Sequence, residues 1–357
     1  MKLLPWAILL CANLSCRSSG PPDSSDPSAA AAAKPEEAEP AAEPAKQAER
    51  LTVYCGRGEA LAAPALAAFE QASGVDLEIR YGDTAQLAAA ILEEGARSPA
   101  DVFIAQDAST LGFLEGKNAF AALPPAVIDA VPQGSKSARG LWVGLSGRAR
   151  VLAYNTRRVK PEELPKSLDE LTAPKWRGRV GWAPENASFQ SFVAAMIAIE
   201  GREKTGQWLE AMKKNAPKDY AKNTPAVVAV STGEIDVALV NHYYLHRLRD
   251  EKGKELPVEN HYFRSGDAAS LVNLSGGAVL AASKKQESAA KLLAYLLSAN
   301  GQKHFVQGNH ELPVASAAPQ PEGLPSVASL KAPAIDPAQL DNLRDTVALL
   351  RETEVLR

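Results

Sequence analysis

An alternation of strand-like and helix-like segments limits the fold more than any other feature of this sequence. Segment 51–54 is apolar and is followed by a helical pattern that Gly74 ends. Residues 75–81 then alternate as a strand, a second helical pattern ends at Gly95, and residues 101–105 form another buried strand. This order predicts an α/β domain with a mostly parallel sheet.

A second unit of the same kind follows in the middle of the chain. Residues 179–182 are typical of a strand, and helical patterns cover 188–199 and 204–212. A further strand at 237–240 leads into a helix over 243–250. We therefore expect two α/β units in the folded part of the chain.

The N-terminus is typical of an exported protein. A short apolar stretch follows Lys2, is too brief to span a bilayer, and ends at Leu14-Ser15-Cys16, as in bacterial lipoprotein signals. We expect residues 1–16 to be a lipoprotein-type signal and Cys16 to carry the lipid anchor, with ordinary signal cleavage nearby as the alternative. Residues 17–50 are rich in Pro, Ala, Ser and Glu and predict a disordered tether. The protein is therefore expected at the periplasmic or extracytoplasmic face of a membrane.

Composition and motifs exclude several classes of protein. The formal net charge is −3 and no Lys/Arg-rich run is present, so no nucleic-acid partner is predicted. Only Cys55 falls in the folded part, which excludes a disulfide framework. Among the histidines, only His242 and His246 have a spacing that suits two ligands of one metal ion. We favour the interpretation that these two side chains are solvated or hydrogen-bonded. A zinc enzyme is not predicted.

Two adjacent tyrosines follow the predicted strand that ends at Val240. Adjacent residues within a helix point about 100° apart, so Tyr243 and Tyr244 can aim at one point only near the turn from strand to helix. Ligands of open α/β sheets bind beyond the C-terminal ends of strands, where this turn lies. A lone tyrosine is more often packed in a core with its hydroxyl hydrogen-bonded. The adjacent pair at this turn instead indicates a ligand site.

A second group of polar residues lies on one predicted strand. With the period of two of a strand, Arg148, Arg150, Leu152 and Tyr154 share one face. Buried charge needs a partner, so we expect an anion in a cleft to satisfy one arginine, while a carboxylate elsewhere in the fold can serve the other. The glycine-rich segment 55–59, between a strand and a helix, could also bring backbone N–H groups toward an anion.

Tyrosine and arginine without histidine or cysteine favour one kind of ion. Phenolate is a hard oxygen donor, whereas thiolate and imidazole favour copper and zinc. The pKa of free tyrosine is about 10, so phenolates form at neutral pH only beside a strong Lewis acid. Three phenolates would balance the charge of Fe³⁺, and an arginine-held anion such as carbonate would fill the remaining coordination positions. The residues therefore predict a ferric-iron site.

In these motifs the chain resembles the bacterial ferric-iron-binding periplasmic proteins of the type II solute-binding superfamily. The resemblance covers nearly all of 51–357, and the matching motifs lie at 52–59, 98–103, 146–151, 174–179, 220–223, 241–244 and 275–278. It implies a two-lobed α/β fold, each lobe a mixed, mostly parallel sheet flanked by helices, with the ligand in the cleft between the lobes. Lobe 1 would comprise residues 51–153 and 266–357, and lobe 2 would comprise residues 154–265.

The resemblance also implies which residues bind the ligands. The family's tandem tyrosines match Tyr243 and Tyr244, and a third tyrosine ligand, used by a three-tyrosine subset, matches Tyr154. The positions expected to bind the anion are Arg57, Arg148, Asn186, Ala187, Ser188, Asn223 and Asn241.

Some members of the family add a histidine and a glutamate from the first lobe. The matching positions here are Gly58 and Gln106, neither of which is a good Fe³⁺ ligand. This departure favours the three-tyrosine subset and leaves Glu59 and Asp107 as spare candidates. Cys55 stands where relatives have serine or asparagine, and we expect a small buried side chain there.

The function that the resemblance implies is that of the substrate-binding component of an ABC importer. The protein would capture Fe³⁺ with the tyrosines and a synergistic anion, carbonate or bicarbonate, and deliver it as a monomer to the importer's permease. A binding protein for an oxyanion or small organic acid, such as a phosphonate, is the alternative, and it would stay colourless. An exported enzyme using Ser188, His242 or Cys55 lacks a nucleophile–base pattern, so no enzyme is predicted.

Overall fold

The computed structural model describes residues 49–321, 323–333 and 343–356. Contacts between residues divide the chain into units 1–46 and 47–357, and all described residues belong to the second unit. The predicted signal, Cys16 and nearly all of the predicted tether lie outside the described residues. No helix in the described part is both long enough and apolar enough to cross a bilayer.

Strands of the described part form one mixed sheet. Their bounds are β1 (Arg50–Cys55), β2 (Asp76–Tyr81), β3 (Val102–Ala105), β4 (Trp142–Asn155), β5 (Val180–Trp182), β6 (Lys218–Asp219), β7 (Val237–Asn241), β8 (Val258–His261), β9 (Val272–Val279) and β10 (Leu312–Pro313). The order is β2-β1-β3-β9-β4-β7-β5-β6, and β8 and β10 also pair with β4. Strand β1 pairs in parallel with β2 and β3, and β5 pairs in parallel with β6 and β7. Strands β4 and β9, in the middle, pair only antiparallel with their neighbours in the described sheet.

Helices lie between these strands, as the alternation in the sequence predicts. Their bounds are α1 (Glu59–Ser73), α2 (Thr84–Glu94), α3 (Ala108–Gly116), α4 (Pro125–Ile128), α5 (Leu168–Leu171), α6 (Ala187–Glu200), α7 (Arg202–Lys214), α8 (Asn223–Thr232), α9 (Tyr243–Lys252), α10 (Gln286–Leu297), α11 (Ala299–Lys303) and α12 (Leu343–Glu352). The α/β class predicted from the sequence is confirmed.

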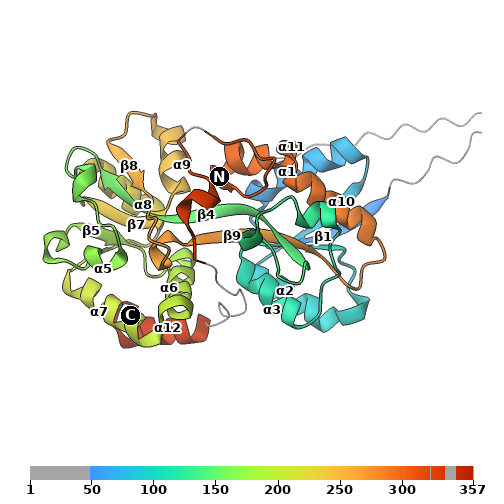
Figure 1. Cartoon of the computed structure of the whole chain (residues 1–357), viewed down its shortest axis with the longest axis horizontal. Coiled ribbons are helices and arrows are strands. Elements are labelled where there is room, and N and C mark those ends of the chain that lie inside the picture. Colours follow the sequence, from blue (N-terminus) through green and yellow to red (C-terminus); the bar gives the residue numbers. More distant parts are fainter. Residues whose placement is uncertain (1–48, 322, 334–342, 357) are drawn as a thin grey trace, which may run out of the picture. The chain divides into compact units, whose positions relative to one another are not determined.

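Strand β4 belongs to both halves of the sheet (Figure 1). Its first part, from Trp142 to Ala149, pairs with β9. Its second part, from Arg150 to Asn155, pairs with β7 and β8. The strand therefore changes partners between Ala149 and Arg150, beside the arginines that the sequence singles out.

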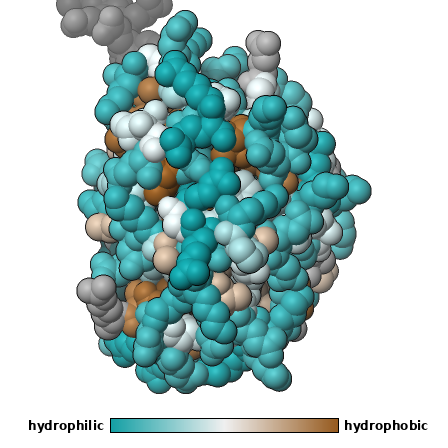
Figure 2. Space-filling view, turned by 90° about the vertical axis from the view of Figure 1, so that its left-hand side faces the viewer, coloured by the Kyte–Doolittle hydropathy of each residue, from teal (hydrophilic) through white to brown (hydrophobic). Residues whose placement is uncertain are grey.

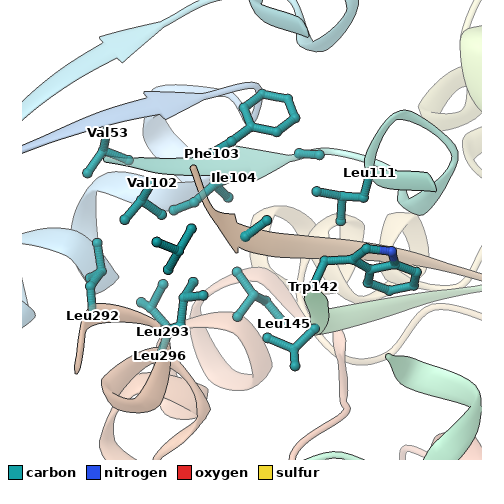
Figure 3. Close-up of a cluster of buried hydrophobic side chains, with 14 of the residues drawn as sticks. Val53, Val102, Phe103, Ile104, Leu111, Trp142, Leu145, Leu292, Leu293 and Leu296 are labelled. Atoms are coloured by element: carbon teal, nitrogen blue, oxygen red, sulfur yellow. The ribbon is translucent and has the colours of Figure 1, made fainter. Parts of the chain in front are cut away.

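Each half of the sheet has its own hydrophobic packing. In the first half, strand residues such as Val102 and Ile104 lie against the apolar face of α10, which includes Leu293, while Phe103 points to the other side of the sheet (Figure 3). In the second half, the period of two sends alternate residues to opposite faces. Leu152 faces a cluster rich in aromatic residues, and Val151 faces a separate cluster under α8 and α9.

The C-terminal helix α12 packs with the second half of the sheet. It lies against α6 and α7, and Leu349 and Leu350 belong to the same hydrophobic cluster as Leu152 (Figure 1). The boundaries that the sequence predicts for the two lobes stay a prediction. Because α12 buries its apolar side chains in the second cluster, we propose that residues 343–356 belong to lobe 2 rather than to lobe 1.

The surface is mainly hydrophilic where Figure 2 shows it. Apolar residues form small, separate spots on this face of the molecule (Figure 2). Leu92 is the one exposed large hydrophobic residue in the described part of the chain. Single exposed leucines are ordinary on protein surfaces and do not indicate a docking site.

Candidate functional site

The turn from β7 into α9 brings the tandem tyrosines side by side. Strand β7 is buried along its length and ends at Asn241, and α9 begins at Tyr243. The rings of Tyr243 and Tyr244 have centroids 4.3 Å apart and planes tilted by 34°. The two hydroxyl-bearing rings are therefore close enough to serve one ligand, as the strand-to-helix turn predicts.

The surroundings keep the Tyr243 hydroxyl protonated when no metal is bound. Burial raises the pKa of Tyr243, and the adjacent Tyr244 raises this pKa further. The positive charge of Arg148 and a hydrogen bond with Asn241 lower it, but they do not outweigh the burial. A phenolate at this position therefore needs a strong Lewis acid that replaces the proton.

Arg150 is a buried cation beside these tyrosines. It is only 3% exposed, and its Nη1 donates to Asn241 Oδ1 at 3.2 Å. Its Nε and Nη2 have no hydrogen-bond partner, and no carboxylate in the described residues forms an ion pair with it. Burial lowers the pKa of Arg150 to about 9, while the hydroxyls of Tyr244 and Tyr243 raise it. The guanidinium thus stays charged at neutral pH and lacks a fixed counter-charge.

Arg148 is the second buried arginine of strand β4. Its Nη2 donates to the backbone carbonyl of Gln106, and its Nε has no partner. Its charge lowers the pKa of both Tyr243 and Glu311. Arg148 therefore acts electrostatically on Tyr243, and its expected role as an anion partner stays a prediction.

Arg150 also connects the tyrosines to the start of α6. Its guanidinium carbon lies 5.5 Å from the ring centroid of Phe189 and 4.9 Å from that of Phe192, both on α6. This packing places the first turn of α6 near Asn241. The N-terminus of a helix carries a partial positive charge and favours anions.

The predicted anion-binding residues meet at that helix start. Asn186 caps α6, and its Oδ1 accepts from the Ser188 N–H at 3.0 Å and from the Ser188 hydroxyl at 2.7 Å. The fully buried Asn223 donates from Nδ2 to Asn186 Oδ1 and to Ser188 Oγ, each at 3.1 Å. Its own Oδ1 has no partner. Ala187 is the first residue of the helix, so four predicted positions form one connected group.

Arg57 is engaged by a carboxylate, and the expectation that it also binds the anion stays a prediction. Its Nη2 donates to both carboxylate oxygens of Glu311, at 2.8 and 2.9 Å, and its Nη1 donates to Ser146 and Ser275. The side chains of Arg57 and Glu311 are 0% and 2% exposed. A buried arginine needs a counter-charge, and Glu311 supplies it. Arg57 therefore already has a buried counter-charge without a bound anion.

Tyr154 does not lie with the tandem pair. On β4 it faces the same side as Arg150, but it is paired with Val237, whereas Arg150 is paired with Asn241. Four strand residues separate the two pairings, which corresponds to about 13 Å. Tyr154 packs in the second hydrophobic cluster and borders an open pocket together with His261. Strand periodicity therefore predicted correctly which face of β4 carries Tyr154. The pairing of β4 with β7 places Tyr154 at a distance from the turn that carries Tyr243 and Tyr244.

The spare candidates have other surroundings. Asp107 caps α3 by accepting from the Thr110 N–H at 3.0 Å, and Glu59 is exposed at the start of α1. Cys55 is buried, and burial raises the pKa of its thiol to about 11, so it is the small core side chain that we expect. In the part of the chain that the structure describes, no group of three or more His, Cys, Asp or Glu residues could hold a metal ion.

Two functional features were not found from the sequence. Glu311 is 254 residues from Arg57 and carries no local signal of its role. Arg150 was recognised as a buried charge, but its position beside Asn241 and the tyrosines depends on the pairing of β4 with β7. For His242, the hydrogen-bonded interpretation is confirmed, since its ring bonds Ala149 and His310.

Comparison with known proteins gives the family. Residues 97–339 match the family of bacterial extracellular solute-binding proteins. The chain is 35% identical over 308 residues to the major ferric iron-binding protein of Neisseria meningitidis serogroup B, covering 85% of this chain and 92% of that protein. Two similar structures are iron-bound HitA from Pseudomonas aeruginosa and the Trichodesmium protein IdiA (FutA) in complex with iron and citrate. HitA is 37% identical to this chain with a TM-score of 0.74, and IdiA (FutA) is 28% identical with a TM-score of 0.71. Each match covers 85% of this chain and 99% of the other protein's chain.

These matches confirm the resemblance that the sequence motifs indicate and the fold of a two-lobed periplasmic binding protein. The chain belongs to the bacterial extracellular solute-binding proteins, among the ferric-iron-binding periplasmic members of that family.

Proposed function

We propose that this protein captures Fe³⁺ with the phenolates of Tyr243 and Tyr244 and delivers it to the permease of an ABC importer. The observation that carries the proposal is the close pair of tyrosine rings beside Arg150, a buried cation without a fixed counter-charge. The similar structures from Pseudomonas aeruginosa and Trichodesmium are of iron-bound proteins, which supports the same ligand. The family consists of solute-binding transport proteins, so the prediction that the chain is not an enzyme is confirmed.

The charges of the site favour ferric iron with an accompanying anion. Two phenolates leave one positive charge on Fe³⁺, so a further anionic ligand completes the balance. We place that synergistic anion, carbonate or bicarbonate, at the start of α6, near Asn186, Ala187, Ser188 and Asn223. Arg148 and Arg150 add positive charge to the same site. Hard oxygen donors of this kind suit Fe³⁺ better than softer metals.

Closure of two lobes would then exclude water from the iron. The proposed lobes are residues 51–153 and 266–333 on one side, and residues 154–265 with 343–356 on the other. Strands β4 and β9 connect them, so a change in bending of these strands would move one lobe against the other. We also propose that Cys16 carries a lipid anchor and that the protein acts as a monomer.

Titration with Fe³⁺ tests the proposed ligand directly. We expect the metal-free protein to develop a visible charge-transfer band when Fe³⁺ and bicarbonate are added together, and a weaker band when bicarbonate is omitted. Citrate in place of bicarbonate tests a second anion. If the protein instead binds a phosphonate tightly and stays colourless with Fe³⁺, the alternative of an oxyanion or organic-acid carrier is correct and the iron proposal is wrong.

Replacement of Arg150 by methionine should separate iron binding from stability. Methionine preserves packing against Phe189 and Phe192 but removes the buried charge. The metal-free variant is expected to be as stable as the parent or more stable, because an unpaired buried charge opposes folding. Its affinity for Fe³⁺ is expected to fall about 10- to 100-fold, as for other residues that support metal ligands.

The matched control for this change is Arg157→Met, at an exposed arginine in the loop after β4. Both variants are compared with the parent by denaturant unfolding without iron and by competition for Fe³⁺ against a chelator. Equal iron affinity in the parent and in Arg150→Met would show that Arg150 has no role in the site.

A further inference from the structure

His242, the residue before the tandem tyrosines, is fully buried, and all of its polar groups are hydrogen-bonded. Its N–H donates to the Ala149 carbonyl and its ring Nδ1 accepts from the Ala149 N–H, both at 3.1 Å. Its carbonyl accepts from Asn260 Nδ2 at 2.9 Å, and its Nε2 lies 2.7 Å from the His310 carbonyl. Because Nδ1 has to accept, the ring is the neutral tautomer with its proton on Nε2, which donates to His310.

The residues that follow contact His310 as well. His242, His246 and Asp250 are spaced four apart, so they lie along one face of α9 and its first turn. The rings of His246 and His310 stack with centroids 5.4 Å apart and planes 23° apart. Nε2 of His310 lies 2.5 Å from Asp250 Oδ2. One residue from outside α9 therefore contacts the helix along two turns, including the turn that carries Tyr243.

His310 is itself held in place by the first half of the sheet. It is followed by Glu311, which forms the buried ion pair with Arg57 in the loop after β1. Its φ is 57°, in the left-handed region that is unfavourable for a residue with a Cβ. Such a conformation persists where the surrounding contacts determine it. The direction of the His310 carbonyl is thus set by the ion pair of Glu311 with Arg57 and by the contacts of the His310 ring with α9.

We propose that His242 is the positioning residue for the two iron-binding tyrosines. Its ring joins the β4 backbone to the His310 carbonyl and so sets the orientation of the first turn of α9. The proposal rests on the function proposed above, because it concerns the geometry of the same site. The ring of His242 also meets Tyr243 edge-on, with centroids 5.8 Å apart and planes at 85°, so a shift of one ring moves the other.

Two substitutions at this position test the role. His242→Gln keeps a donor that can reach the His310 carbonyl, whereas His242→Leu removes both ring hydrogen bonds. In His242→Leu we expect the affinity for Fe³⁺ to fall about 10- to 100-fold, as for other supporting partners of metal ligands. The phenolate-to-iron band should shift in wavelength, and His242→Gln should restore part of both effects. The control is His261→Leu, whose ring lies 2.9 Å from the Pro165 carbonyl, and its band should stay unchanged.

The outcomes separate this proposal from the proposed function. If the parent protein shows no band with Fe³⁺, the proposed function fails. If the parent shows the band and folded His242→Leu has the same band and affinity, only the positioning role fails. It also fails if His261→Leu shifts the band as strongly. If His242→Leu does not fold, ¹⁵N NMR of the histidines in the parent decides, since a proton on Nδ1 of His242 would overturn the proposal and a proton on Nε2 supports it.

Discussion

The double substitution Tyr243→Phe/Tyr244→Phe is expected to abolish both Fe³⁺ binding and the visible colour of the iron-loaded protein. Phenylalanine keeps the packing of each ring but cannot supply a phenolate oxygen. The loss of two anionic ligands should lower the affinity more than about 1,000-fold, which corresponds to about 4 kcal/mol. Each single variant should retain weak binding with a reduced band. The measurement is visible absorption during Fe³⁺ titration, followed by competition with a chelator.

Tyr154→Phe provides the matched control for this experiment. The chemical change is the same, but the residue lies about 13 Å away along β4, so binding and colour should match the parent. Two results would contradict the site assignment. One is a double variant that still binds Fe³⁺ with full colour, and the other is a Tyr154→Phe variant that has lost the band.

Glu311→Gln is expected to cause the largest loss of stability among the changes considered. It leaves the guanidinium of Arg57 buried without a counter-charge, and breaking a buried pair in this way costs about 3–5 kcal/mol. Denaturant unfolding of the metal-free protein measures the effect. The control is Glu287→Gln, which removes an exposed ion pair with Lys291 and should leave the unfolding midpoint unchanged. An unchanged midpoint in Glu311→Gln would show that the ion pair does not stabilise the fold.

The same residue predicts how stability depends on pH. Burial alone raises the pKa of Glu311, but the charges of Arg57 and Arg148 outweigh it and hold this pKa below its usual range. Because the pKa is lower in the folded state than in the unfolded state, the stabilisation is complete above the unfolded value of about 4.3. It is lost as the pH falls from there through the folded value. Glu311→Gln should lack this part of the acid sensitivity.

The sequence predicts local features of this protein better than distant ones. The α/β order follows from periodicity and helix-ending glycines, and the tyrosine turn follows from two adjacent residues at the end of a buried strand. These signals lie within a few residues of each other. Periodicity also placed Arg150, Leu152 and Tyr154 on one face of β4 correctly.

Features that depend on tertiary pairing could not be predicted in the same way. The period of two gives the face of a strand residue but not its place along the neighbouring strand, so Tyr154 was expected at the iron site. The partner of Arg57 lies 254 residues away, and nothing near Glu311 identifies it. The resemblance to relatives indicated the anion positions at the start of α6, and the structure brings four of them together.

The shared strand β4 has a consequence for the order in which the chain can assemble. Strands β5, β6, β7 and β8 follow β4 without interruption, so their half of the sheet is built from one continuous stretch. The other half needs β9, which lies between β3 and β4 but is translated only after the whole second half. Until β9 is made, the edge of β3 that faces away from β1 has no partner strand. The chain between β3 and β9 forms a long loop that has to close before they pair. During synthesis, the half of the sheet with the earlier residues is therefore the later one to receive all of its strands, and α12 packs against the second half only after that.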